Sequence, residues 1–195
     1  MSSIDELASR LRARAQQAGF EQSSTLAVGE LLSVLAASKP GGRMLELGTG
    51  VGLGVLHLLD GMSADATLVT VELDPILSHI AQEEIDDSRV EFVIADGADW
   101  LETQASTPKA GSYDLVFADT WPGKFDHRAE ALALIAEGGF YVVDDLLPQH
   151  TWPPGHQPKV DTLKAELAEL DGWKVVRIND ASGVMICSRS AGTVR

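Results

Sequence analysis

The sequence predicts an α/β fold, a doubly wound, mostly parallel sheet of seven strands with helices on both faces. Three observations lead to this prediction. Short apolar runs alternate with helical patterns, a glycine-rich stretch follows the first run, and a turn-forming tetrapeptide joins the last two. Strands separated by helices form parallel crossovers, whereas strands joined by a short turn pair antiparallel. We therefore expect parallel units closed by a C-terminal antiparallel hairpin.

Two cap helices are expected before the first strand. Apolar residues recur at helical spacing from Ile4 to Gln17, and Gly19 ends this pattern. A second helical pattern runs from about Thr25 to Ser38, where Pro40-Gly41-Gly42 stops it. At 195 residues the chain fits one domain. We expect a single domain with these boundaries: cap helices in 1–40 and a core in 41–190.

The remaining chain alternates between strand and helix patterns. Apolar runs predict strands at 43–47, 67–71, 90–94, 114–118 and 139–143. Helical patterns fall near 52–60, 75–86, 97–104, 125–136 and 158–169. The closing hairpin pairs 173–179 with 184–188.

Composition argues against several classes of protein. Fifteen basic and 29 acidic residues leave a net charge of −14, which disfavours nucleic-acid partners because phosphate backbones need clustered Lys and Arg. No apolar run approaches the roughly 20 residues that span a bilayer, and Met1–Glu6 lacks the basic start of a secretory leader. We expect a cytoplasmic protein without a membrane partner. Cys187, the only cysteine, excludes an intrachain disulfide and is expected in a buried strand.

The strongest functional signal is the stretch LELGTGVGLG at Leu45–Gly54. Glycines there let the backbone turn tightly and approach a ligand closely. A dinucleotide site has the pattern G-x-G-x-x-G, with the pyrophosphate at the helix N-terminus. Here the glycines alternate, Leu53 interrupts that pattern, and Glu46 places a carboxylate that would repel a pyrophosphate but suit a cation. S-adenosylmethionine (SAM) carries an ammonium and a sulfonium and no phosphate.

This stretch resembles the first motif of class I SAM-dependent methyltransferases, which implies a Rossmann-like sheet. Glu72 ends the second predicted strand. At this distance from the glycine loop, nucleotide-binding folds carry an acidic residue that hydrogen-bonds the ribose hydroxyls, and we expect Glu72 to do so. Asp96 follows the third strand, where this superfamily contacts adenine, so we expect it to bind the adenine amino group. Asp74 is expected to cap the helix that starts at Pro75. The expected cofactor contacts are Glu46, Gly48, Thr49, Gly50, Gly52, Glu72, Leu73, Asp96, Gly97, Ala98 and Asp119.

Acidic residues follow the fourth and fifth strands. Asp119 follows the fourth, and Asp144 and Asp145 follow the fifth. Neighbouring strand ends lie about 5 Å apart, so we expect the three carboxylates to converge beside the SAM pocket. A hard divalent cation would relieve their repulsion, and oxygen-only ligation suits Mg²⁺, with Mn²⁺ or Ca²⁺ as alternatives.

The arrangement resembles the metal-dependent O-methyltransferases related to catechol and caffeoyl-CoA O-methyltransferases, over most of the chain. In that family an Asp after the fourth strand and an Asp-Asn pair after the fifth bind the metal. Two departures stand out: Asp145 replaces the Asn, and Pro122-Gly123 precedes Lys124, which the family places closer to its Asp. The resemblance implies that Asp119 and Lys124 are catalytic, with Lys124 assisting deprotonation of the acceptor hydroxyl. It also implies a homodimer through the N-terminal helices.

The loop after Gln149 is expected to shape the acceptor pocket. Trp121 and Trp152 are candidate flat walls for an aromatic acceptor, and Trp100 and Trp173 are expected in the core. The two loop histidines, His150 and His156, could contact substrate or act as a base, but simple exposure is the alternative.

The predicted reaction is SAM-dependent methyl transfer to a hydroxyl of a small molecule such as a catechol, with a divalent metal. Three alternatives stay open: a metal-independent methyltransferase acting on a small N or O nucleophile, an NAD-dependent dehydrogenase, and a non-catalytic module that binds SAM or a partner.

Overall fold

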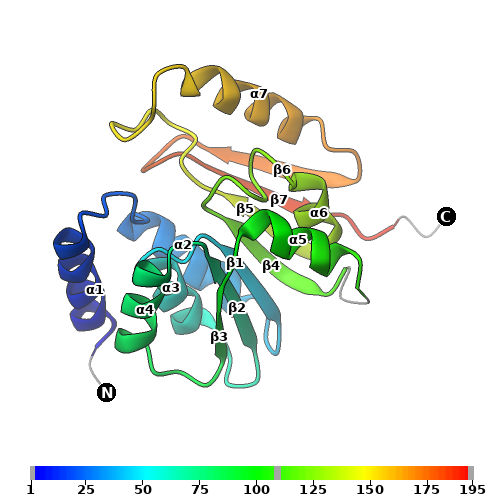
Figure 1. Cartoon of the computed structure of the whole chain (residues 1–195). Coiled ribbons are helices and arrows are strands. Elements are labelled where there is room, and N and C mark those ends of the chain that lie inside the picture. Colours follow the sequence, from blue (N-terminus) through cyan, green and yellow to red (C-terminus); the bar gives the residue numbers. More distant parts are fainter. Residues whose placement is uncertain (1–2, 108–110, 193–195) are drawn as a thin grey trace.

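A computed structural model describes residues 3–107 and 111–192 and confirms the predicted fold class (Figure 1). The strands are β1 Arg43–Leu47, β2 Thr67–Glu72, β3 Val90–Ile94, β4 Tyr113–Ala118, β5 Ile135–Val143, β6 Trp173–Ile178 and β7 Val184–Arg189. They form one sheet in the order β3-β2-β1-β4-β5-β7-β6. The first five strands pair in parallel, and β7 runs antiparallel to both of its neighbours. The expected C-terminal hairpin is therefore present.

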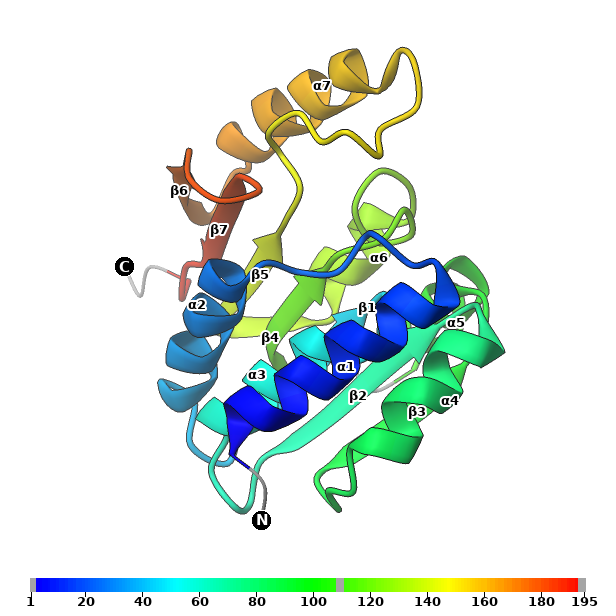
Figure 2. The ribbon, with the colours of Figure 1, turned by 90° about the vertical axis from the view of Figure 1, so that its left-hand side faces the viewer.

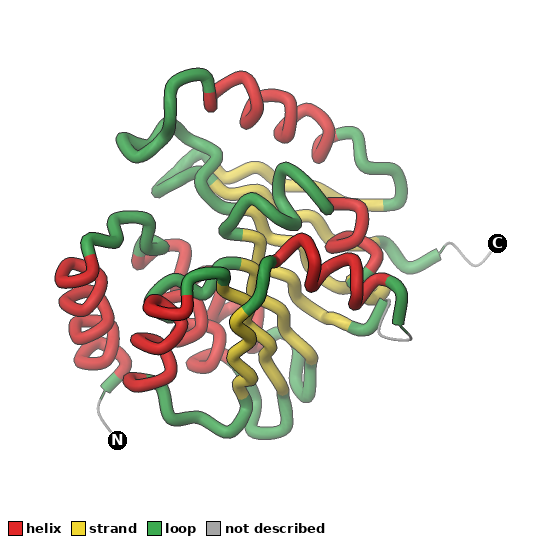
Figure 3. Tube along the Cα trace, viewed as in Figure 1, coloured by secondary structure: helices red, strands yellow, loops and turns green. Residues whose placement is uncertain are grey.

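Helices cover both faces of the sheet in a three-layer arrangement (Figure 3). They are α1 Ile4–Ala18, α2 Leu26–Ala37, α3 Leu53–Gly61, α4 Pro75–Glu84, α5 Gly97–Ala105, α6 Arg128–Ala133 and α7 His156–Ala168. The first four helices share an apolar core with one face of the sheet, and α5, α6 and α7 share a second core with the other. The expected cap helices are α1 and α2, and α1 begins with a Ser3–Glu6 capping box.

The largest difference from the sequence prediction lies between β4 and β5. A helix was expected over 125–136, but α6 covers only Arg128–Ala133, and β5 begins four residues before the expected 139. Ala131, Leu134 and Ile135 have helical spacing and are all buried, yet Ile135 pairs with Tyr113 of β4. Strand pairing therefore overrides the local helical pattern at this point.

The carboxyl ends of the parallel strands carry the loops that form the site, as in other open α/β sheets. The extended segment between α1 and α2 crosses in front of the sheet (Figure 2). Within the described part of the chain, no helix is long and apolar enough to span a bilayer.

Candidate functional site

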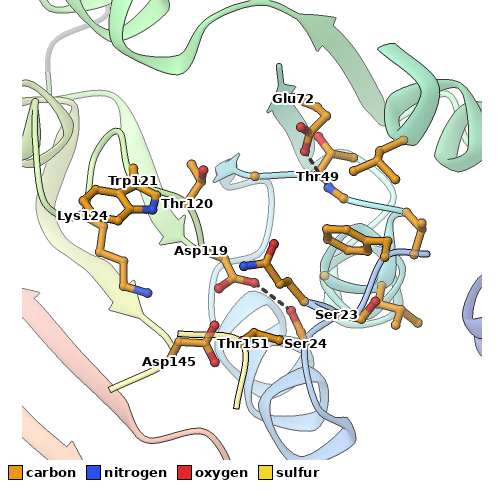
Figure 4. A pocket seen from close by; sticks show the side chains of 18 of the residues that line it. Ser23, Ser24, Thr49, Glu72, Asp119, Thr120, Trp121, Lys124, Asp145 and Thr151 are labelled. Atoms are coloured by element: carbon orange, nitrogen blue, oxygen red, sulfur yellow. Dashed lines mark hydrogen bonds between the residues drawn. The ribbon is translucent and has the colours of Figure 1, made fainter. Parts of the chain in front are cut away.

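A cavity of about 460 Å³ opens at the carboxyl ends of β1, β2 and β4. Its walls come from the glycine loop, from the segment joining α1 to α2, and from the loops after β4 and β5 (Figure 4). The expected cofactor residues Glu46, Gly48, Thr49, Gly50, Glu72 and Asp119 all line it. A smaller cavity of about 70 Å³ adjoins it and is lined in part by Leu73, Asp96 and Gly97. Two of the expected cofactor residues, Gly52 and Ala98, line neither of these two cavities.

The glycine loop has a backbone shape that requires glycine. Gly48, Gly50 and Gly52 have φ of +97°, +52° and +95°, a region that other residues rarely adopt. A Cβ added at Gly48 would lie 3.0 Å from the carbonyl oxygen of Asp119. Gly52 precedes α3, and a Cβ there would lie 2.9 Å from Ile85. Gly52 thus serves helix packing, while Gly48 and Gly50 shape the cavity wall.

Glu46 lies in a buried position that favours the uncharged form of its carboxyl. Its side chain is buried, and its Oε2 accepts a hydrogen bond of 2.5 Å from the Thr70 hydroxyl. Burial raises the pKa of Glu46 to about 8 despite this bond, and the nearby Glu72 raises it further. The carboxyl is therefore largely protonated at neutral pH. The sequence predicted that a negative charge on Glu46 would repel a pyrophosphate. Because burial favours the neutral carboxyl, Glu46 does not supply that repulsion here.

Glu72 and Asp96 lie on the side of the cavity expected for the nucleoside. Glu72 accepts hydrogen bonds from the backbone N–H of Gly50 (2.8 Å) and of Asp74 (3.0 Å), so it links the glycine loop to the end of β2. Asp96 is exposed and accepts from the N–H of Ala98 at 2.8 Å, capping α5. Asp74 caps α4 by accepting from the N–H of Ile76, and Pro75 is the first helical residue, as predicted.

The three aspartates converge, but they do not form a metal site in this structure. Asp119, Asp144 and Asp145 all border one small cavity beside the main one. The Asp144 carboxylate, however, already accepts hydrogen bonds from the Ser182 hydroxyl and the Asp145 N–H. Among residues 3–107 and 111–192, no group of three or more His, Cys, Asp or Glu side chains is arranged to hold a metal. The three carboxylates thus adjoin one another without being arranged as a ligand set, and the Asp119–Asp144–Asp145 metal site stays a prediction.

Lys124 is the cationic partner of this acidic group. It is only 5% exposed, and its amine points into the space that Asp119 and Asp145 face (Figure 4). Burial raises the pKa of Asp119, the neighbouring Asp144 raises it further, and Lys124 opposes both effects. Burial likewise raises the pKa of Asp144 and of Asp145, and Lys124 again counteracts the shift. The inserted Pro122-Gly123 therefore does not carry Lys124 away from the site.

An aromatic cluster forms the wall opposite the glycine loop. His156 lies at its centre, with ring centroids 5.5 Å from Trp121, 5.1 Å from Phe125 and 4.7 Å from Trp152. It is 7% exposed, and burial lowers its pKa, which favours the neutral imidazole. His150, in contrast, is exposed, which is the alternative stated above for both loop histidines. Its ring lies 3.5 Å from Glu21 at the surface.

The tryptophans and the cysteine expected in the core lie close to their predicted places. Trp100 and Trp173 are half-buried and pack against the second core, and Cys187 is fully buried in β7.

Two contributors to the site had no recognisable sequence signal. Phe20, Gln22, Ser23 and Ser24, between α1 and α2, line the cavity. The Ser24 hydroxyl donates a hydrogen bond of 3.1 Å to Asp119. Ser182 reaches Asp144 from the hairpin turn. Single serines in turns are common in any sequence, so only the tertiary contacts identify them.

The family model described as O-methyltransferase matches residues 3–188 of this chain. The chain belongs to the O-methyltransferase family. A relative from Mycobacterium ulcerans, named as an O-methyltransferase, is 37% identical over 125 residues, which cover 61% of this chain and 54% of the relative. A second from Mycobacterium leprae is 34% identical over 149 residues, covering 72% of this chain and 63% of the relative. The matches thus span little more than half of these relatives' length.

Solved structures share the O-methyltransferase fold over nearly the whole chain. The O-methyltransferase TomG of Streptomyces achromogenes, involved in tomaymycin synthesis and solved with SAM, has a TM-score of 0.81 at 22% identity, covering 98% of this chain and 91% of TomG. An O-methyltransferase from Bacillus cereus, solved with S-adenosylhomocysteine (SAH), has a TM-score of 0.80 at 19% identity, covering 96% and 91%. At these identities the likeness establishes the fold.

Proposed function

We propose that this chain transfers a methyl group from SAM to a hydroxyl of a small aromatic molecule. One observation carries the proposal: a single cavity joins the glycine loop to a buried lysine and an aromatic wall. The donor and acceptor of a group transfer need adjoining places in one enclosed space. Family membership and the SAM and SAH bound to TomG and the Bacillus cereus enzyme support the choice of cofactor.

The residues of the loop fit SAM. Gly48 and Gly50 leave the wall free of side chains, which suits close approach of a nucleoside. We assign the ribose hydroxyls to Glu72, and adenine to the smaller cavity beside Asp96, Gly97 and Leu73. Asp119 supplies a carboxylate for the ammonium group. Bound SAM supplies an electrophilic methyl group; the remaining chemistry belongs to the side chains.

Lys124 is proposed to handle the proton of the acceptor hydroxyl. Its amine is buried, and its charge acts on Asp119, Asp144 and Asp145, lowering the pKa of each carboxyl. Once the amine has released its own proton to solvent, it accepts the proton of an approaching hydroxyl, and the ammonium so formed stabilises the oxyanion. The attraction of Asp119 and Asp145, which face the same space, is proposed to orient the lysine.

The aromatic cluster is proposed to hold the acceptor ring. Trp121, Phe125, Trp152 and His156 present flat apolar surfaces to the cavity. We expect Trp152→Ala to raise KM for a phenolic acceptor about tenfold while leaving SAH affinity within twofold, because a stacked ring contributes roughly 1–2 kcal/mol. Steady-state kinetics and calorimetry check this. A matched loss in Trp173→Ala, on the distant β6, would instead indicate general destabilisation.

The test of the function is direct. SAH should bind by calorimetry, NAD should not, and radiolabelled methyl groups should transfer from SAM to a panel of phenols and catechols. Binding of SAH without turnover of any acceptor would favour the non-catalytic module. Transfer to amines alone would replace the hydroxyl acceptor by a nitrogen nucleophile.

A cation-dependent reaction is the second candidate, because three acidic side chains gather beside the acceptor wall. The residues as arranged do not make a ligand set, so no step above depends on a metal. We expect transfer rates to be unchanged within twofold by EDTA. A loss of more than tenfold that Mg²⁺ restores would mean that Asp144 exchanges Ser182 for a cation.

We propose a single domain, a cytoplasmic location and a homodimer, with a small-molecule acceptor favoured over nucleic acid by the net charge of −14.

A further inference from the structure

A buried chain of hydrogen bonds lies directly behind the glycine loop. Thr70, in the middle of β2, is 0% exposed. Its hydroxyl donates to Oε2 of Glu46 at 2.5 Å and is hydrogen-bonded to the Thr49 hydroxyl at 2.6 Å. Thr70 thus connects β1 to the loop that follows it.

The three groups form one continuous chain from β1 to the cavity wall. The Thr70 hydroxyl lies between the Glu46 carboxyl and the Thr49 hydroxyl and bonds to both. Thr49 in turn lines the cavity, so this chain links the wall of the cavity to the buried carboxyl behind it.

The Glu46 carboxyl is confined on its other side as well. A Cβ at Gly54 would lie 1.9 Å from Glu46 Oε1, so the carboxyl lies against the first turn of α3. Glu46 is 1% exposed and Thr49 4%, so solvent reaches them only through the cavity that they line. Breaking the chain at Thr70 would remove a hydrogen-bond partner from both of these largely buried groups at once.

We propose that Thr70 is a positioning residue for the cofactor, holding the glycine loop in its binding shape through Thr49 and Glu46. The proposal rests on the proposed function, since it takes SAM as the ligand of the loop. A loop that reaches its binding shape only part of the time has an apparent affinity reduced by that fraction.

The first test compares Thr70→Val, Thr70→Ser and Ser78→Ala. Valine keeps the size of threonine and removes the hydroxyl; serine restores it. Ser78 is an equally buried hydroxyl, bonded to Gln82 at 3.0 Å on α4, and serves as the control. We expect Thr70→Val to weaken SAH binding about tenfold by calorimetry. Thr70→Ser and Ser78→Ala should bind within twofold of the wild type.

Two further readouts separate positioning from general destabilisation. KM for SAM should rise in Thr70→Val while kcat at saturating SAM stays within twofold. Hydrogen exchange of the Gly48 and Gly50 amides should speed up in the ligand-free variant. Wild-type affinity in Thr70→Val, an equal loss in Ser78→Ala, or no rescue by serine would overturn the proposal.

A second variant keeps the proposal testable if Thr70→Val does not fold. Thr49→Val removes the same link from the loop side but leaves Glu46 its partner Thr70. Unchanged SAH affinity in this variant would overturn the role of the chain of bonds. Failure of the wild type to bind SAH would instead remove the proposed function itself.

Discussion

Replacing Lys124 by methionine is expected to lower kcat for methyl transfer by about a hundredfold or more. Methionine keeps the length and apolar stem of lysine and removes the amine. The amine is buried on the cavity wall, and it is the group assigned above to the proton and the oxyanion of the acceptor hydroxyl. SAH affinity should change little, which calorimetry checks alongside the kinetics.

Two companion variants identify what Lys124 contributes. Lys124→Arg keeps the positive charge but loses an amine that can exchange its proton, so we expect it to remain strongly impaired. Lys159→Met removes an exposed lysine that stacks on Trp121 at 4.6 Å, and it should keep most of its activity. A Lys124→Met enzyme with more than a tenth of wild-type kcat would rule out Lys124 as the proton-handling group.

Glu46→Gln is expected to flatten the dependence of folding stability on pH. Burial raises the pKa of Glu46 to about 8 in the folded chain, against 4.5 for an exposed glutamate. Between these values the unfolded chain releases a proton that the folded chain retains. The free energy of unfolding therefore falls as pH rises through this window, by about 1 kcal/mol per pH unit from this group.

Urea unfolding between pH 5 and pH 8 measures the effect. The wild type should lose stability across this range, and Glu46→Gln should lose less, so that the variant gains relative to the wild type at pH 8. Glu91→Gln provides a control, because Glu91 is exposed on β3. Parallel pH profiles for the wild type and Glu46→Gln would show that Glu46 is already ionised in the folded protein.

The sheet and the cofactor side of the site could be predicted from the sequence because their signals are local. Alternating apolar runs marked the strands, and the glycine loop is a continuous stretch whose backbone angles need glycine. The state of Glu46 could not be predicted, because it depends on Thr70 from another strand and on burial. Asp144 likewise finds Ser182, 38 residues away, which no spacing rule indicates. The early start of β5 was missed because Ile135 fits a helical pattern locally.

The two sides of the cavity are built from different parts of the polypeptide. The glycine loop presents mainly backbone, so almost any substitution at Gly48 or Gly50 would introduce atoms where the chain bends. The facing wall consists of the rings of Trp121, Phe125, Trp152 and His156, carried by loops and the first residue of α7. Loops accept sequence change more readily than strands do. Redesign of the acceptor preference should therefore begin with these four rings, with the donor side left intact.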